Sequence, residues 1–155
     1  KSSWIRLMRG STKYKKIGRT MKKILFLIIL LISFSNVYGQ DWISDSNFND
    51  KIHEKSAFGD DEMSIVVVEF WAKFNDANSF KDWDKVKNIT HYYRVDISKA
   101  PNAKKEYKVR MAPTIIVFKD GIKEEVYKAG LDLECPVDLD ELQEHIDELK
   151  LGSQF

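Results

Sequence analysis

The sequence has a single cysteine, Cys135, among its 155 residues. A dithiol that exchanges with a substrate disulfide needs two cysteines, so one thiol already restricts the redox chemistry open to this chain. Neither an internal repeat nor a low-complexity tract interrupts the sequence, and 43% hydrophobic with 32% charged residues is typical of a globular protein. The length is enough for one domain and is short for two.

No acidic residue occurs before residue 40, whereas nine of the 25 Lys and Arg residues do. From Gln40 onward, 16 basic residues stand against 24 acidic ones, a net charge of −8. The overall charge of +1 therefore conceals a basic front and an acidic body. An acidic body repels phosphate backbones, which argues against nucleic acid as a partner.

The sequence also lacks an apolar run long enough to cross a bilayer. Residues 24–34 form an apolar run of 11 residues, against the roughly 20 that a spanning helix needs. This run follows Lys22 and Lys23 and precedes small and polar residues that end at Gly39, a pattern typical of a secretory signal peptide. The alternative is a membrane anchor, which the short run disfavours. No cysteine follows the run directly, so a lipoprotein anchor is excluded.

We expect cleavage between Gly39 and Gln40 and export to the periplasm or the extracellular space, with no stable membrane anchor afterwards. Met21 stands directly before the two lysines, where a signal peptide would begin. We therefore interpret residues 1–20 as an upstream extension, residues 21–39 as the signal peptide and residues 40–155 as the folded domain.

Periodicity and turn signals predict an alternating α/β chain. Strands are expected at residues 42–43, 64–71, 91–96, 114–118 and 122–129, and helices at the segments that begin at Ser46, Asp76, Pro101 and Asp138. Helical crossovers between the early strands favour parallel pairing, whereas the Asp120-Gly121 turn favours an antiparallel hairpin at the end. The sequence thus predicts a mixed central sheet with helices on both faces.

Histidines do not cluster in this sequence. His53, His91 and His145 fall on separate predicted elements, and Glu141 with His145 supplies two ligands on one helix face, too few for a metal site. We interpret that pair as a solvated one, and the sequence predicts neither a metal nor a cofactor.

Two motifs carry a resemblance to a known family. The first is VEFWAKF (residues 68–74), and the second is YKVRMAPT (residues 107–114) followed by IIVFKDG. Together with the predicted element order, they resemble the thioredoxin family over residues 41–151. The resemblance implies a thioredoxin fold, in which the first motif leads into the active-site helix and the second holds a cis-proline, Pro113.

The family's chemistry needs a Cys-x-x-Cys motif at the start of that helix, where the helix dipole and the N–H groups lower the pKa of the first thiol. The resemblance places those two positions at Asn75 and Asn78. Asparagine forms no thiolate, so dithiol exchange by the family mechanism is not available to this chain.

Other features of the family site remain in the sequence. The resemblance implies a groove in which an extended peptide pairs with backbone beside Pro113, and the residues expected to line it are Trp71, Phe74, Asn75, Asn78, Ala112 and Pro113. Glu69 matches the family's buried acid, which resembles a proton shuttle. The simpler interpretation of Glu69 is a carboxylate that is hydrogen-bonded under the helix or paired with Lys73.

Cys135 has two interpretations. It belongs to the segment of residues 130–136, which we expect at the same end of the sheet as Asn75 and Pro113. A single cysteine in an exported protein can form an intermolecular disulfide or act as a reactive thiol. Alternatively it is a small apolar residue under the last helix, and the acidic residues near it, Glu134 first, would raise the thiol's pKa.

The sequence therefore favours a redox-inactive, exported thioredoxin-like domain that binds a protein or extended peptide through the Pro113 groove. The alternative from a different functional class is a thiol–disulfide oxidoreductase or redox-homeostasis protein that uses Cys135 alone. A third interpretation is a structural subunit whose groove is vestigial. The sequence does not determine the oligomeric state.

Overall fold

We analysed a computed structural model of the chain, which describes residues 41–55 and 63–152. All of these residues belong to one compact unit, residues 39–155. The predicted upstream extension (1–20) and signal peptide (21–39) lie outside the described residues. Among the residues that are described, no helix is long and apolar enough to cross a membrane.

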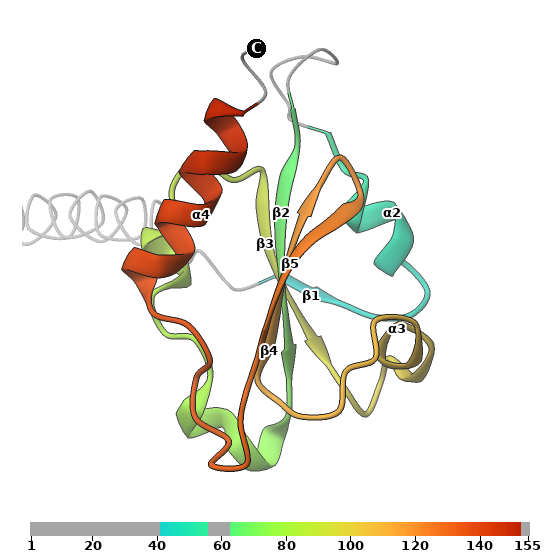
Figure 1. Ribbon diagram of the computed structural model, residues 1–155. Helices are drawn as coiled ribbons and strands as arrows, with labels where there is room; N and C mark the ends of the chain where they lie inside the picture. The colour runs from blue at the N-terminus through green and yellow to red at the C-terminus, as the bar shows by residue number, and fades with distance from the viewer. Residues whose placement is uncertain (1–40, 56–62, 153–155) are drawn as a thin grey trace, which may run out of the picture. The chain divides into compact units, whose positions relative to one another are not determined.

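A five-stranded mixed sheet forms the centre of this unit (Figure 1). Its spatial order is β1-β3-β2-β4-β5, with β1 at Asp41–Ile43, β2 at Ile65–Trp71, β3 at His91–Asp96, β4 at Thr114–Lys119 and β5 at Ile122–Lys128. Strand β3 pairs in parallel with β1 and β2, whereas β4 pairs antiparallel with β2 and β5. The predicted parallel start and antiparallel end are both confirmed.

Strand β2 lies in the middle of the sheet because its sequence, IVVVEFW, suits burial on both faces. All its residues except Trp71 are buried. β-Branched side chains pack well on a pleated surface, and a strand covered on both sides needs a nearly continuous apolar run. The polar exception inside this run is Glu69, which is fully buried.

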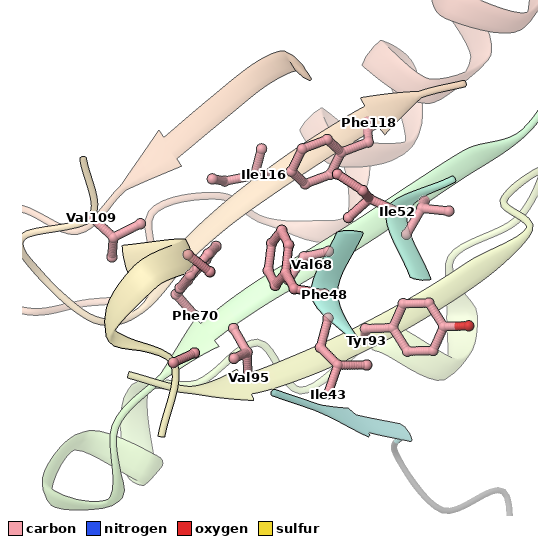
Figure 2. Packing of buried hydrophobic residues seen from close by; sticks show 13 residues of the cluster. Ile43, Phe48, Ile52, Val68, Phe70, Tyr93, Val95, Val109, Ile116 and Phe118 are labelled. Carbon is pink, nitrogen blue, oxygen red and sulfur yellow. The ribbon is translucent and has the colours of Figure 1, made fainter. Parts of the chain in front are cut away.

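Helices cover the two faces of the sheet separately, as the sequence predicted (Figure 1). Helices α2 (Phe48–Ile52) and α3 (Pro101–Glu106) pack on one face, where Phe48, Ile52 and Ala103 join a cluster with side chains of the strands (Figure 2). Helix α4 (Leu139–Leu151) covers the other face through Leu142 and Ile146. The two clusters together make a three-layer α/β/α core.

Helix α4 begins at the position that the sequence predicted. Asp138 is the N-cap residue, and its carboxylate accepts a hydrogen bond of 2.9 Å from the backbone N–H of Glu141. This contact satisfies one of the N–H groups that a helix start leaves without an intrahelical partner. One face of α4 is apolar, because Leu139 and Leu149 pack against the same cluster as Leu142 and Ile146.

The helix predicted to begin at Asp76 is wrong. Two short 3₁₀ segments, η1 (Lys73–Asn78) and η2 (Trp83–Lys85), stand in its place. In an α-helix the N–H of Phe80 would donate to the carbonyl of Asp76, four residues earlier. Here it donates to the Glu69 carboxylate at 3.0 Å, and the Asp76 carbonyl instead accepts from the backbone N–H of Ser79 at 3.2 Å.

Side chains of nearby residues also bind the backbone carbonyl of Asp76. The Asp76 carbonyl also accepts from the Ser79 hydroxyl and from Lys81 Nζ, each at 2.7 Å. The Asp76 carboxylate accepts from the Trp71 indole at 2.8 Å and does not cap a helix. Asn, Asp and Ser favour such local contacts over helix propagation, so the apolar spacing of residues 80–86 was a misleading helix signal.

Gly121, in the turn between β4 and β5, generates a prediction about stability. Its φ is +79°, and a Cβ built there would lie 2.2 Å from the His53 ring. Gly121→Ala should lower the free energy of unfolding by about 1–2 kcal/mol from the left-handed backbone alone, and the ring must also move. Urea unfolding of Gly121→Ala, with and without His53→Ala, measures the two contributions. An unchanged midpoint for Gly121→Ala would contradict the analysis.

Candidate functional site

The candidate site is the corner where β2 ends and η1 begins. Asn75 and Asn78, the residues at the expected cysteine positions, both lie on η1 and are half-buried. The segment between β5 and α4 (residues 129–138) meets them at the same end of the sheet (Figure 1). The expected proximity of Asn75, the proline loop and residues 130–136 is therefore observed.

Hydrogen bonds from the two amides join these three segments. Asn75 Nδ2 donates to the carbonyl of Ala112 at 2.9 Å and to the carbonyl of Leu133 at 2.7 Å. Asn78 Nδ2 donates to Asn75 Oδ1 at 3.0 Å and to the same Leu133 carbonyl at 3.1 Å. The positions that would hold a dithiol thus hold a network of side-chain amides, which we call the amide network.

The remaining expected groove residues differ in accessibility. Ala112 and Pro113 are buried, and the peptide bond between them is cis. Phe74 is 76% exposed, and Leu131 of the 130–136 segment is 92% exposed. The outer surface of the corner therefore offers large apolar side chains, while the backbone beside Pro113 lies beneath the amide network.

Trp71, the last residue of β2, contacts a second tryptophan, which was predicted as part of a strand but not as a site residue. Trp42 of β1 lies 5.1 Å from Trp71 between ring centroids, edge to face, and is half-exposed. The guanidinium of Arg94 lies over both rings, with Cζ 5.7 Å and 6.0 Å from the two centroids. Such cation–π contacts hold the two indoles over the buried end of Arg94.

Glu69 lies at the centre of a buried polar cluster. Its Oε2 accepts from Arg94 Nε and Nη2, each at 2.8 Å, and from the Tyr92 hydroxyl at 3.3 Å, while Oε1 accepts from Phe80 N–H. Burial raises the pKa of the Glu69 carboxyl above its usual value, and Arg94 opposes that shift. The hydrogen-bonded structural interpretation of Glu69 fits these contacts, but its partner is Arg94 rather than Lys73.

Sequence reasoning missed Arg94, although a signal was present. Arg94 stands in the middle of a strand whose neighbours are buried, and a charged residue there requires a partner. Strand register places Arg94 directly beside Glu69 on one side and Trp42 on the other. The register itself is a property of the sheet and could not be read from either strand alone.

Cys135 is partly buried and packs against the apolar cluster under α4. Its Sγ lies 3.4 Å from the carbonyl of Val137, to which it donates a hydrogen bond. Burial raises the pKa of the Cys135 thiol, and the charge of Glu69 adds to this shift. The thiol is therefore poorly suited to act as a nucleophile near neutral pH.

The three histidines stay apart in the structure as well. His91 lies on β3, 3.8 Å from the Glu54 carboxylate, and His145 lies on α4 beside Tyr127. Within residues 41–55 and 63–152, no group of three or more His, Cys, Asp or Glu side chains is arranged to hold a metal ion. The corner thus exposes amide and apolar side chains, while the Glu69 carboxylate is buried and paired with Arg94.

The Glu69–Arg94 pair generates a second prediction. Arg94→Met should lower the free energy of unfolding at neutral pH by about 3–5 kcal/mol, because it leaves the buried carboxylate without its counter-charge. Arg94 opposes the rise in the pKa of the Glu69 carboxyl, so its removal should raise that pKa further. The loss of stability should therefore shrink as the pH falls from the raised pKa of the variant toward that of the wild type. Urea titrations across the acid range measure this dependence.

The matched control removes both charges. Glu69→Leu combined with Arg94→Met should recover most of the stability, since an apolar pair replaces an ionic one without leaving a lone charge. A loss in Arg94→Met that stays constant with pH would contradict the role assigned to Glu69.

Comparison with known proteins agrees with this architecture. The chain is 35% identical over 64 residues to Thioredoxin-2 of Pyricularia oryzae, a stretch that spans 38% of this chain and 37% of that protein. The crystal structure of a designed protein has a similar fold, with a TM-score of 0.54 and 23% identity over 71% of this chain and 96% of that one. The model of the thioredoxin family matches residues 41–148, so the chain belongs to the thioredoxin family and carries a thioredoxin-like domain.

Proposed function

We propose that this chain is a redox-inactive thioredoxin-like domain, exported from the cytoplasm, which binds a protein or extended peptide partner at its corner. The observation that carries the proposal is the amide network: both cysteine positions hold asparagines whose amides are bonded to the protein itself. The corner lacks the dithiol of the family and has a 3₁₀ segment in place of the helix, which supports a binding role for it.

Thiol–disulfide exchange through Cys135 alone is the second candidate, and the name of the fungal relative favours it. Two features count against it. Burial raises the pKa of the Cys135 thiol, and the residue packs among apolar side chains under α4. A mixed disulfide formed by Cys135 would also have no second thiol to resolve it, because Cys135 is the single cysteine of the chain.

Partner binding is supported by the apolar residues that the corner exposes. Phe74 and Leu131 are exposed, and they belong to the two segments that the hydrogen bonds of Asn75 and Asn78 to Leu133 join. Large exposed apolar side chains at one place are a common mark of a protein contact. Export is supported by the pattern of residues 22–39, and the acidic body argues against nucleic acid.

Restoring the cysteines tests how far the family chemistry has been lost. The thiol introduced at position 75 in Asn75→Cys/Asn78→Cys should keep a pKa near the ordinary value of about 8.5. The reason is that η1 is a short 3₁₀ segment with non-helical backbone at Asn75, so no α-helix dipole acts on the thiol. Alkylation rates against pH, in a Cys135→Ser background, measure this pKa. A pKa well below 8 would show that the corner still activates a thiol.

The partner itself is tested by capture from the exported compartment with free thiols blocked at lysis. Binding of a non-covalent partner at the corner should persist in Cys135→Ser. Leu131→Asp should weaken it by about tenfold or more, since it puts a charge where the bound partner would bury an apolar side chain. Leu151→Asp is the matched control, because Leu151 is also exposed, at 60%, but lies at the end of α4.

The same experiment separates the alternatives. Binding lost in Cys135→Ser would establish the single-thiol mechanism, and binding equally insensitive to Leu131→Asp and Leu151→Asp would overturn the corner as the binding surface. The mass of the recovered chain tests export, because cleavage after Gly39 leaves a protein that begins at Gln40.

A further inference from the structure

Strand β5 is the last strand of the sheet, and within the described residues it pairs with β4 alone. The backbone N–H of Ala129, the residue after β5, donates to the Pro113 carbonyl at 3.1 Å and so points toward the β4 side. N–H groups alternate in direction along a strand, so those of Val126 and Lys128 point away from β4, toward the free edge of the sheet. Such an edge can pair with a strand of another chain unless the protein closes it.

A side chain of β5 itself already binds one of these two donors. The Val126 N–H donates to Oε1 of Glu125, the residue before it, at 2.9 Å. We call this contact the edge cap. A β-bulge lies next to it, because Glu124 has no counterpart in β4. Bulges and charged side chains are two of the means by which proteins protect an edge strand.

We propose that the edge cap is an autoinhibitory contact, and that the strand it excludes is β5 of a second copy of the chain. A neighbouring strand would need the Val126 N–H as a donor, and the Glu125 carboxylate occupies that group. The inference goes beyond the proposed function and is independent of it, because the contact involves only residues of β5.

A second β5 fits this edge by symmetry. Two copies that pair antiparallel about Tyr127 place Val126 of each copy opposite Lys128 of the other, so each outward N–H meets an outward carbonyl. Tyr127 then lies opposite its own counterpart, and aromatic cross-strand pairs are favourable. Since Lys128 faces Val126 in this register, no like charges lie directly opposite one another within residues 126–128. A two-fold arrangement of this kind closes as a dimer.

Self-association of single variants tests the edge cap. Glu125→Ala frees the Val126 N–H and should lower the dissociation constant of the dimer by about tenfold or more relative to wild type. Glu125→Gln keeps an acceptor oxygen and should stay near the wild-type value. The matched control is Glu124→Ala, which removes the same charge from the neighbouring exposed position and should have no such effect.

Sedimentation equilibrium compares these proteins. The net charge of −8 from Gln40 onward opposes association, so the measurement is made at about 1 M salt, where this repulsion is screened. A Glu125→Ala protein that associates no more strongly than Glu124→Ala would overturn the proposal.

A second change tests the register. Lys128→Pro removes the other outward N–H at an exposed position, and an edge strand tolerates proline where its N–H faces solvent. Glu125→Ala/Lys128→Pro should therefore return to the association of the wild type. Dimerisation that persists in the double variant would overturn the β5 edge as the contact.

A measurement on the wild-type chain covers the case in which Glu125→Ala does not fold. The backbone N–H groups of Val126 and Lys128 both point to the free edge, but the Glu125 carboxylate accepts from the first. After correction for the intrinsic rates, hydrogen exchange at Val126 should be slower than at Lys128 by about tenfold or more. Equal exchange rates would show that the edge cap does not form and would overturn the proposal.

Discussion

The buried carboxylate of Glu69 is the contact on which the rest of the corner depends. It joins β2 to β3 through Arg94 and Tyr92, and it takes the Phe80 N–H that an α-helix would have used. A charge with no solvent exposure must be compensated by hydrogen bonds and an opposite charge, so these partners are fixed in place. Arg94 in turn lies over the rings of Trp42, on the edge strand β1, and of Trp71, at the end of the central strand β2.

Outward from that centre, the amide network closes the corner. The shortened η1 segment presents Asn75 and Asn78 to two loops, and their amides close the backbone beside Pro113. In the same step the network fixes Phe74 and Leu131 on the outside. The asparagines at positions 75 and 78, the short 3₁₀ segment and the amide contacts thus occur together at this corner, and the proposed function depends on that combination.

Much of the architecture could be predicted from the sequence because the signals were local. The β-branched run of β2, the Asp120-Gly121 turn and the Asp138 cap each act within a few residues, and each appears where expected. The conformation of the segment after Asp76 could not be predicted, since it depends on the carboxylate of Glu69, eleven residues before Phe80. Apolar spacing alone gave no sign that Glu69 would take the Phe80 N–H.

The sequence by itself determined the family, the mixed sheet and the absence of a dithiol, because strand patterns, turn residues and residue identity at positions 75 and 78 do not depend on distant contacts. Only the tertiary structure decided the partner of Glu69, the burial of Cys135 and the convergence of the Ala112 and Leu133 carbonyls on Asn75. The physical reason is that these contacts join residues far apart in the sequence. Hydrogen bonds and desolvation act between groups brought within a few ångströms, and for these residues the chain separation ranges from 25 to 58 positions.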